Sequence, residues 1–191
     1  MEEQKIDRRV RKTKSQLRQA LMQLMTEKPF KSISVRELSE RADINRGTFY
    51  IHYRDASDLL QHLEDEMAER LITVCKKYSY TDTAVEAFPY LTELYRFAQE
   101  NADLCQVLLG PNGDRVYTER ICSILHSYFL RDFVARFYSG DRDRLEYFCR
   151  FIVSGNLTLT LQWLSSGTKE TPEEMAQLAG KIIMNGVGVL Q

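Results

Sequence analysis

The chain has 191 residues, 43% of them hydrophobic and 28% charged, and its 26 Lys and Arg against 27 Asp and Glu give a formal net charge of −1. This length fits one or two compact domains, and the hydrophobic fraction excludes global disorder. Nine glycines and four prolines are few for a turn-rich all-β protein.

Hydrophobic residues at helical spacing begin close to the N-terminus and predict a first helix with one apolar face. Pro29 ends this helix because proline disfavours the helical conformation in the residue before it. Ser34 and Glu37 form a capping box that begins a short second helix. Asn45 caps a short third helix that runs to about Tyr53. The apolar face of the first helix consists of Leu17, Ala20, Leu21, Leu24 and Met25.

A longer fourth helix is predicted to begin after Asp55, and the polar stretch 78–83 follows it. Its apolar stripe consists of Leu60, Leu63, Met67, Leu71 and Val74. Further helices are predicted near residues 84–100, 102–109, 115–138, 142–165 and 172–190. Glycine-containing segments at 110–113 and 139–141 are predicted to interrupt these helices. A capping box at 171–174 begins the last helix. With about nine helices and no strong strand alternation, the predicted fold class is all-α.

The charge is distributed unevenly along the chain. Residues 8–54 contain twelve Lys and Arg but four Asp and Glu, a net charge of +8, so the remainder carries −9. A basic first quarter joined to an acidic remainder predicts a module that faces phosphate, attached to a part that does not.

Three short helices in a basic unit, the second and third separated by a tight turn, match a helix-turn-helix. In the third helix Phe49 and Tyr53 lie four residues apart and can hold the helix to the core. The other faces are then left for base edges and phosphates. Gly47 has no side chain, so the helix can approach a groove wall closely.

The run Ser34-Val35-Arg36-Glu37-Leu38, followed by Ala42, Ile44 and residues 46–53, resembles the DNA-binding domain of TetR-family transcriptional regulators over about residues 10–60. The resemblance implies that Arg46, Gly47 and Thr48 approach bases in the major groove, and that Tyr50 and His52 contact phosphates or nearby bases. It also implies that residues at the start of the first two helices contact the DNA backbone. The candidate DNA contacts are Thr13, Lys14, Ser34, Val35, Arg36, Asn45, Arg46, Gly47, Thr48, Tyr50, His52 and Tyr53.

One position departs from the family pattern. The family commonly places a lysine at the start of the fourth helix, where its ammonium and the helix N-terminus both face phosphate. Here Ala56 occupies that position, with Asp55 and Asp58 beside it. This phosphate contact is therefore in doubt, although backbone amides at the helix end still suit an anion.

The family resemblance implies a helix-turn-helix domain over residues 1–54 and a regulatory and dimerisation domain over 55–191. One recognition helix reads too few base pairs to select a genomic site, so we expect a homodimeric repressor on a palindromic double-stranded DNA operator. Two helices with small residues suit a four-helix bundle across a two-fold axis. The candidate interface residues are Tyr147, Phe151, Ser154, Thr158, Leu161, Met175, Leu178 and Ile182.

The middle of the chain is rich in aromatic residues, and in the family this region encloses a small-molecule pocket. The candidate pocket residues are Tyr95, Phe97, Tyr117, Tyr128, Phe129 and Phe133. An aromatic stripe at helical spacing also fits a plain core. Residues 101–114, 163–164 and 171–175 resemble a C-terminal subgroup that includes a dihydroxyacetone kinase operon activator, which answers to a protein partner. A protein-controlled co-activator is therefore the alternative, and the effector class stays open.

The cysteines at 75, 105, 122 and 149 are far apart, and the three histidines make no metal-ligand spacing with them. We expect reduced thiols, no metal, no cofactor and a cytoplasmic protein. The charged N-terminus predicts no signal peptide. Residues 151–168 carry no charge, but Asn156, Gln162 and several Ser and Thr are too polar for lipid, so we expect no membrane span.

Two further alternatives remain, an enzyme and a thiol redox sensor. Nucleotide-binding, zinc-protease and serine-hydrolase motifs are absent from the sequence, so we expect no enzyme. Cys122 and His126 lie four apart and could pair as nucleophile and base, but no third orienting group is evident. A redox sensor would need a thiol of lowered pKa, and Cys75 precedes Lys76 and Lys77.

Overall fold

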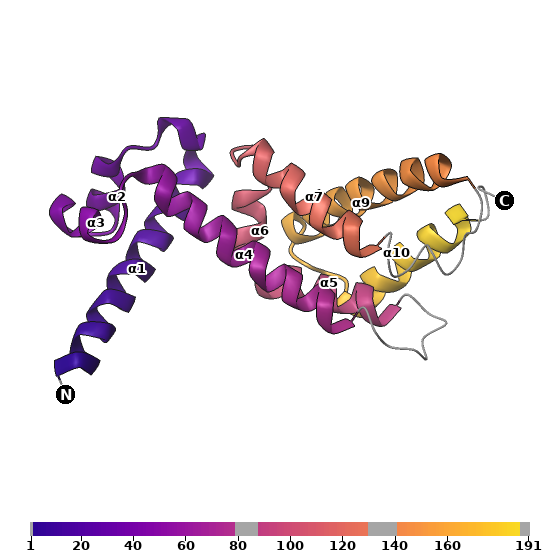
Figure 1. Cartoon of the computed structure of the whole chain (residues 1–191), viewed down its shortest axis with the longest axis horizontal. Helices are drawn as coiled ribbons and strands as arrows, with labels where there is room; N and C mark the ends of the chain where they lie inside the picture. Colours follow the sequence, from indigo (N-terminus) through magenta and orange to yellow (C-terminus); the bar gives the residue numbers. More distant parts are fainter. Residues whose placement is uncertain (1, 79–87, 130–140, 188–191) are drawn as a thin grey trace.

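A computed structural model describes residues 2–78, 88–129 and 141–187, which form nine α-helices and one short 3-10 helix with no strand among them (Figure 1). This confirms the predicted all-α fold. The predicted helical residues 84–87, 130–138 and 188–190 lie outside the described ranges.

The N-terminal unit contains α1 (Glu2–Glu27), the 3-10 helix η1 (Phe30–Ser32), α2 (Val35–Arg41) and α3 (Arg46–His52). All five predicted apolar residues of α1 are buried, so periodicity placed this face correctly. The end of α2 is a Schellman motif, in which the Ile44 amide donates to the Ser39 carbonyl and the Asp43 amide to that of Glu40. Asp43 adopts the left-handed φ of 52° that this motif requires, and the chain turns into α3.

The long helix α4 (Ala56–Tyr78) leads from the N-terminal unit into the rest of the molecule (Figure 1). Leu60, Leu63, Met67 and Leu71 are buried as predicted, while Val74 is half-buried against the core. Because α4 packs against α1 at one end and against α5 and α7 further along, it is a direct mechanical connection between the two parts.

The C-terminal part is a bundle of α5 (Phe88–Glu100), α6 (Ala102–Leu108), α7 (Arg115–Phe129), α9 (Arg142–Ser165) and α10 (Pro172–Val187). Helix α5 packs against α10 and α4, and α7 packs against α9 and α4. The α9–α10 turn is held by Trp163, whose Nε1 donates to the Glu170 carbonyl at 3.0 Å and whose ring lies edge-on to Tyr95.

Candidate nucleic-acid interface

Helix α3 has one buried and one exposed face. Phe49 is fully buried, whereas Tyr50 is 59% and Ile51 76% exposed. Arg46 and Gly47 lie one turn before Tyr50 and Ile51 and are also exposed. These four residues therefore form one outward surface, which we call the reading face. It lies at the end of the molecule formed by α1, α2 and α3 (Figure 1).

The start of α3 explains two predicted residues together. The Asn45 side chain caps the helix, because its Oδ1 accepts a hydrogen bond of 2.7 Å from the Gly47 amide. A Cβ at position 47 would lie 3.3 Å from that Oδ1. Glycine thus makes room for the cap as well as leaving space on the reading face.

Tyr53 corrects the sequence prediction. Its side chain is only 7% exposed, and its ring packs against Phe49 and edge-on against His62 with centroids 5.4 Å apart. Burial, together with the charges of Asp58 and Glu66, raises its pKa. Tyr53 holds α3 against the core, as its spacing from Phe49 predicted, so its place among the DNA contacts is wrong.

Ile51 is a residue that the sequence reasoning missed. It lies two positions after the buried Phe49, and two helical steps of about 100° each turn a side chain to the opposite face. This spacing was a signal available in the sequence. An exposed aliphatic side chain beside Tyr50 suits contact with a thymine methyl group.

The start of α2 is a complete capping box. The Ser34 hydroxyl accepts from the Glu37 amide, and the Glu37 carboxylate accepts from the Ser34 amide at 3.0 Å. Lys28 Nζ lies 2.5 Å from the same carboxylate, and these hydrogen bonds, with that of Lys28 the largest effect, lower the Glu37 pKa to about 2. The cap therefore keeps its charge and its geometry at any physiological pH.

The remaining predicted contacts on α1, α2 and α3 differ in accessibility. Lys14, Ser34 and Arg36 are exposed, Thr13, Thr48 and His52 are half-buried, and Val35 is half-buried against the core. Arg36 Nε lies 2.8 Å from the Glu40 carboxylate, so part of its charge is already neutralised. Arg46 is exposed and forms no ion pair with any residue in the described part of the chain.

The start of α4 carries acids where the family pattern has a lysine. Ala56 is buried, Asp55 Oδ1 accepts from the Asp58 amide, and Asp58 Oδ2 accepts from the Arg54 amide, both at 2.9 Å. The hydrogen bond from the Arg54 amide is the largest effect that lowers the Asp58 pKa, so this carboxylate stays charged. The N-terminal end of α4 is thus already bound by two carboxylates of the protein itself, where the family pattern would place a DNA phosphate.

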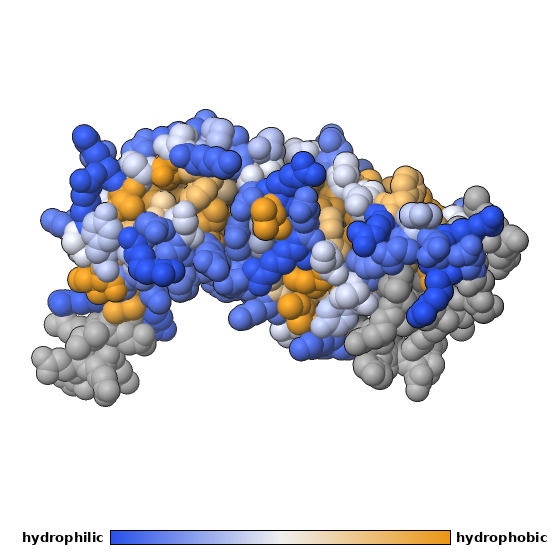
Figure 2. All heavy atoms as spheres, turned by 45° about the horizontal axis from the view of Figure 1, so that its top comes forward, coloured by the Kyte–Doolittle hydropathy of each residue, from blue (hydrophilic) through white to orange (hydrophobic). Residues whose placement is uncertain are grey.

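The predicted dimer face is partly exposed and partly not. Tyr147 and Phe151 are both 72% exposed on α9, with Ser154 and Thr158 exposed further along, and Leu178 and Ile182 are about half exposed on α10. In Figure 2 hydrophobic side chains interrupt the hydrophilic surface at several separate places, over the N-terminal unit as well as over the bundle. Met175, however, is 3% exposed in the core of its own chain, so its assignment to the interface is wrong.

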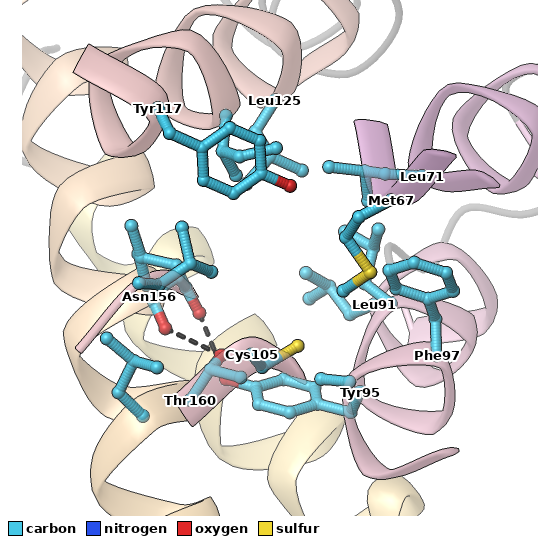
Figure 3. Close-up of a pocket in the computed structure, with 16 residues that line it drawn as sticks. Met67, Leu71, Leu91, Tyr95, Phe97, Cys105, Tyr117, Leu125, Asn156 and Thr160 are labelled. Atoms are coloured by element: carbon cyan, nitrogen blue, oxygen red, sulfur yellow. Dashed lines mark hydrogen bonds between the residues drawn. The ribbon is translucent and has the colours of Figure 1, made fainter. Parts of the chain in front are cut away.

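A cavity of about 90 Å³ lies between α4, α5, α6, α7 and α9. Three of the predicted pocket residues, Tyr95, Phe97 and Tyr117, line this cavity (Figure 3). Tyr128 and Phe129 are not among its lining residues, and Phe133 lies outside the described ranges. Leu161, which the sequence assigned to the dimer face, also lines this cavity.

The structure also bears on the two chemical alternatives. His126 Nε2 lies 3.2 Å from the Glu146 carboxylate, but it makes no hydrogen bond among the described residues, so Glu146 does not orient the imidazole as a third catalytic group would. Burial and the charge of Glu119 raise the Cys122 pKa, so this thiol is not an activated nucleophile. Cys75 is fully buried with the Tyr90 hydroxyl 3.5 Å from its sulfur, so it lacks the exposure that a redox sensor needs.

Two features are absent from residues 2–78, 88–129 and 141–187. These residues hold no cluster of three or more His, Cys, Asp or Glu that suits a metal ion. Likewise, none of the helices in these ranges combines the length and the apolar character that crossing a membrane requires.

Comparison with known proteins agrees with this architecture. Residues 17–63 match the family model described as bacterial regulatory proteins, tetR family, and residues 86–185 match that of a transcriptional regulator C-terminal region. The HTH-type transcriptional regulator YxbF of Bacillus subtilis is 32% identical over 71 residues. That match covers 37% of this chain and only 19% of YxbF.

Two solved structures share the fold over nearly the whole chain. The dihydroxyacetone kinase operon activator DhaS gives a TM-score of 0.58 at 18% identity, covering 93% of this chain and 97% of DhaS. FadR from Bacillus subtilis, a transcriptional regulator solved in complex with stearoyl-CoA, gives 0.63 at 14% identity, covering 90% and 98%. The predicted likeness to DhaS is thus present at the level of the fold.

Proposed function

Because family models match residues 17–63 and 86–185, the chain belongs to the TetR family of transcriptional regulators, and we propose that it is a homodimeric repressor of a palindromic operator. Residues 1–54 form the DNA-reading unit in this proposal, and residues 55–191 form the regulatory and dimerisation unit. The protein acts by binding, not by catalysis, and it acts in the cytoplasm, where the chromosome lies.

The reading face carries the DNA-binding proposal. Arg46 is the side chain best suited to read a base, because a guanidinium can bind guanine O6 and N7 together. Tyr50 is exposed next to it and suits a phosphate or a base edge. Lys14, Ser34 and Arg36, exposed on α1 and at α2, suit phosphates on either side. Phe49 and Tyr53 fix the orientation of all these groups from behind.

Dimerisation is supported by the exposed apolar face of α9 and α10. Tyr147 and Phe151 are large side chains whose exposure in a single chain is unfavourable. Gly155 and Ser154 beside them are small, and a Cβ at Gly155 would meet no atom within 4 Å. A second copy can therefore approach α9 closely and bury this face across a two-fold axis, which would present two reading faces to one duplex.

An effector that binds in the bundle would change operator affinity by shifting the two reading units. The apolar cavity in the bundle supports a small molecule as effector in preference to a protein partner. FadR is a structural neighbour with a bound acyl-CoA, but its low identity restricts that comparison to the fold.

The test is a titration of the protein into a fluorescent duplex from the promoter upstream of its own gene. Binding should weaken steeply as salt rises from 50 to 200 mM, because phosphate contacts release counterions. A Tyr50→Phe variant should lose affinity if its hydroxyl contacts the backbone. Binding that ignores both salt and promoter sequence would refute the proposed function.

A further inference from the structure

The cavity in the bundle is chemically simple. Its walls are mostly Leu, Met, Phe and Ile side chains from five helices, and no Lys, Arg, His, Asp or Glu is among its lining residues (Figure 3). Its volume of about 90 Å³ is well below the roughly 300–1,000 Å³ of pockets for drug-sized ligands. A small uncharged molecule suits a cavity of this size and lining.

Two tyrosine hydroxyls reach this cavity, and they differ in their hydrogen bonds. Tyr95 Oη donates to Asn156 Oδ1 at 3.2 Å, which closes a polar corner at one end (Figure 3). Tyr117 is 2% exposed, and its hydroxyl is buried without a hydrogen-bond partner among the described residues. Figure 3 shows this hydroxyl on α7 directed across the cavity toward Met67 and Leu71 of α4.

A buried hydroxyl without a partner is unfavourable, and the apolar walls around it offer a water molecule too few other partners. Burial and the nearby charge of Glu64 raise the Tyr117 pKa, so the group keeps its proton and is a hydrogen-bond donor.

We propose that this cavity binds a small, uncharged, mainly apolar molecule whose single hydrogen-bond acceptor, such as a carbonyl oxygen, accepts from Tyr117 Oη. The regulatory consequence rests on the proposed function. A ligand held by Tyr117 lies between α7 and α4, and the first turn of α4 follows directly on Tyr53, which packs behind α3. Separating α4 from α7 therefore changes the position of the reading face.

The experiment is calorimetric titration of the full chain at pH 7 with three probes that share a five-membered ring, namely cyclopentanone, cyclopentane and cyclopentanecarboxylate. The Tyr117 hydroxyl should make the ketone bind about three- to tenfold more tightly, relative to the hydrocarbon, than it does when this hydroxyl is removed, the range that one hydrogen bond supplies; we call this difference the ketone preference. The carboxylate should bind most weakly, because nothing in the cavity wall neutralises its charge.

Two variants separate the role of Tyr117 from the shape of the cavity. Tyr117→Phe removes only the unpaired oxygen, so it should fold with an unchanged or higher melting temperature and lose the preference for the ketone. Tyr95→Phe is the matched control, because it removes a paired hydroxyl from the same cavity. It should melt at a lower temperature and keep the ketone preference.

Three results would overturn the inference: no binding of either neutral probe by wild type, an undiminished ketone preference in Tyr117→Phe, or strongest binding of the carboxylate. Titration of the same preparation with duplex DNA distinguishes this failure from failure of the proposed function. If the protein binds duplex DNA but none of the probes, only the proposed ligand is refuted. If it binds the probes but no duplex DNA, only the proposed DNA-binding role is refuted.

Discussion

Neighbouring residues of α3 have opposite environments, and this contrast defines the site at the scale of single side chains. Phe49 is fully buried while Tyr50 and Ile51 are mostly exposed, so substitutions at 49 report on folding and substitutions at 46, 50 and 51 report on binding. Exposed substitutions away from caps and ion pairs usually change stability by less than about 0.5 kcal/mol. Arg46 meets these conditions and is the clearest residue to change.

Arg46→Ala should weaken operator binding by about 1–3 kcal/mol and relax the base preference at one position of each half-site, because a bidentate guanine contact is lost. The melting temperature should not change. Anisotropy titrations against the operator and single-base variants measure both effects. Arg142→Ala is the control, since it removes another exposed positive charge, at the start of α9. Equal losses in the two variants would mean that Arg46 contributes only general charge.

At the scale of elements, the seam between α4 and α7 contains a carboxyl group of raised pKa. Glu64 is half-buried on α4, and one of its oxygens has no hydrogen-bond partner in the described chain. Burial is the main cause that raises its pKa from 4.5 to about 7, with further increases from the charges of Asp114 and Asp65. Arg120, which pairs with Asp65 at 2.5 Å, acts in the opposite direction.

This raised pKa fixes the sign of a pH effect. The folded protein keeps the Glu64 proton over a range in which the unfolded chain releases it, so its stability falls as pH rises from about 4.5 to about 7. Glu64→Gln has an uncharged side chain at every pH. The variant should therefore melt at a higher temperature than wild type at pH 8, and the difference between the two proteins should be smaller at pH 5. Glu69→Gln, on an exposed part of α4, is the control. A gain that is the same at both pH values would contradict this explanation.

A second element-scale contact joins the two units of the chain. The Met25 carbonyl in α1 would normally accept from the amide four residues later, but that residue is Pro29, which has no N–H. Asn112 Nδ2, from the loop between α6 and α7, donates to this carbonyl at 3.0 Å instead. Gly113 makes the loop possible, because a Cβ there would lie 2.1 Å from the Leu108 carbonyl oxygen.

Asn112→Asp should lower the free energy of unfolding by about 1 kcal/mol, because an aspartate of the same shape cannot donate to the Met25 carbonyl. Urea unfolding measures the change. Asn185→Asp makes the same chemical substitution at an exposed position of α10 and should have little effect. If both variants unfold at the same urea concentration as wild type, the Asn112 contact does not stabilise the junction.

For the whole molecule, sequence reasoning succeeded where the determinants are local. The periodicity of Leu17 to Met25 and the capping boxes at Ser34 and Thr171 involve residues within one or two turns, and the structure contains each of them. It failed where partners are distant. Met175 shares the apolar stripe of Leu178 and Ile182, but packing of α10 on α5 decides which part of the stripe is buried.

The same limit applies to the site. The residues of α3 could be read from the sequence because Phe49 and Tyr53 fix the orientation of a short helix. The Asn112 contact to Met25 spans 87 positions, and the cavity needs five helices, so neither has a local signal. Aromatic content pointed to Tyr95, Phe97 and Tyr117, but it gave no reason to separate them from Tyr128 and Phe129, which lie outside the cavity lining.

The proposed dimer is the whole-molecule feature on which the proposed recognition of a palindrome depends. Phe151→Glu places a charge in the exposed apolar face of α9 and should convert the protein to monomers that keep the wild-type helical content, because Phe151 is outside the core. Sedimentation and circular dichroism measure both properties. Gln61→Glu makes the same change in charge at an exposed position of α4, outside α9 and α10, and is the control. A Phe151→Glu protein that remains dimeric would place the interface elsewhere.

The most direct test of the central claim is selection of binding sites from a random duplex library, run in parallel with wild type and Arg46→Ala. If two reading faces enter one duplex, wild type will enrich an inverted repeat, and Arg46→Ala will lose preference at the same position in both halves. Enrichment of a single unrepeated half-site, or of no motif at all, would contradict this account.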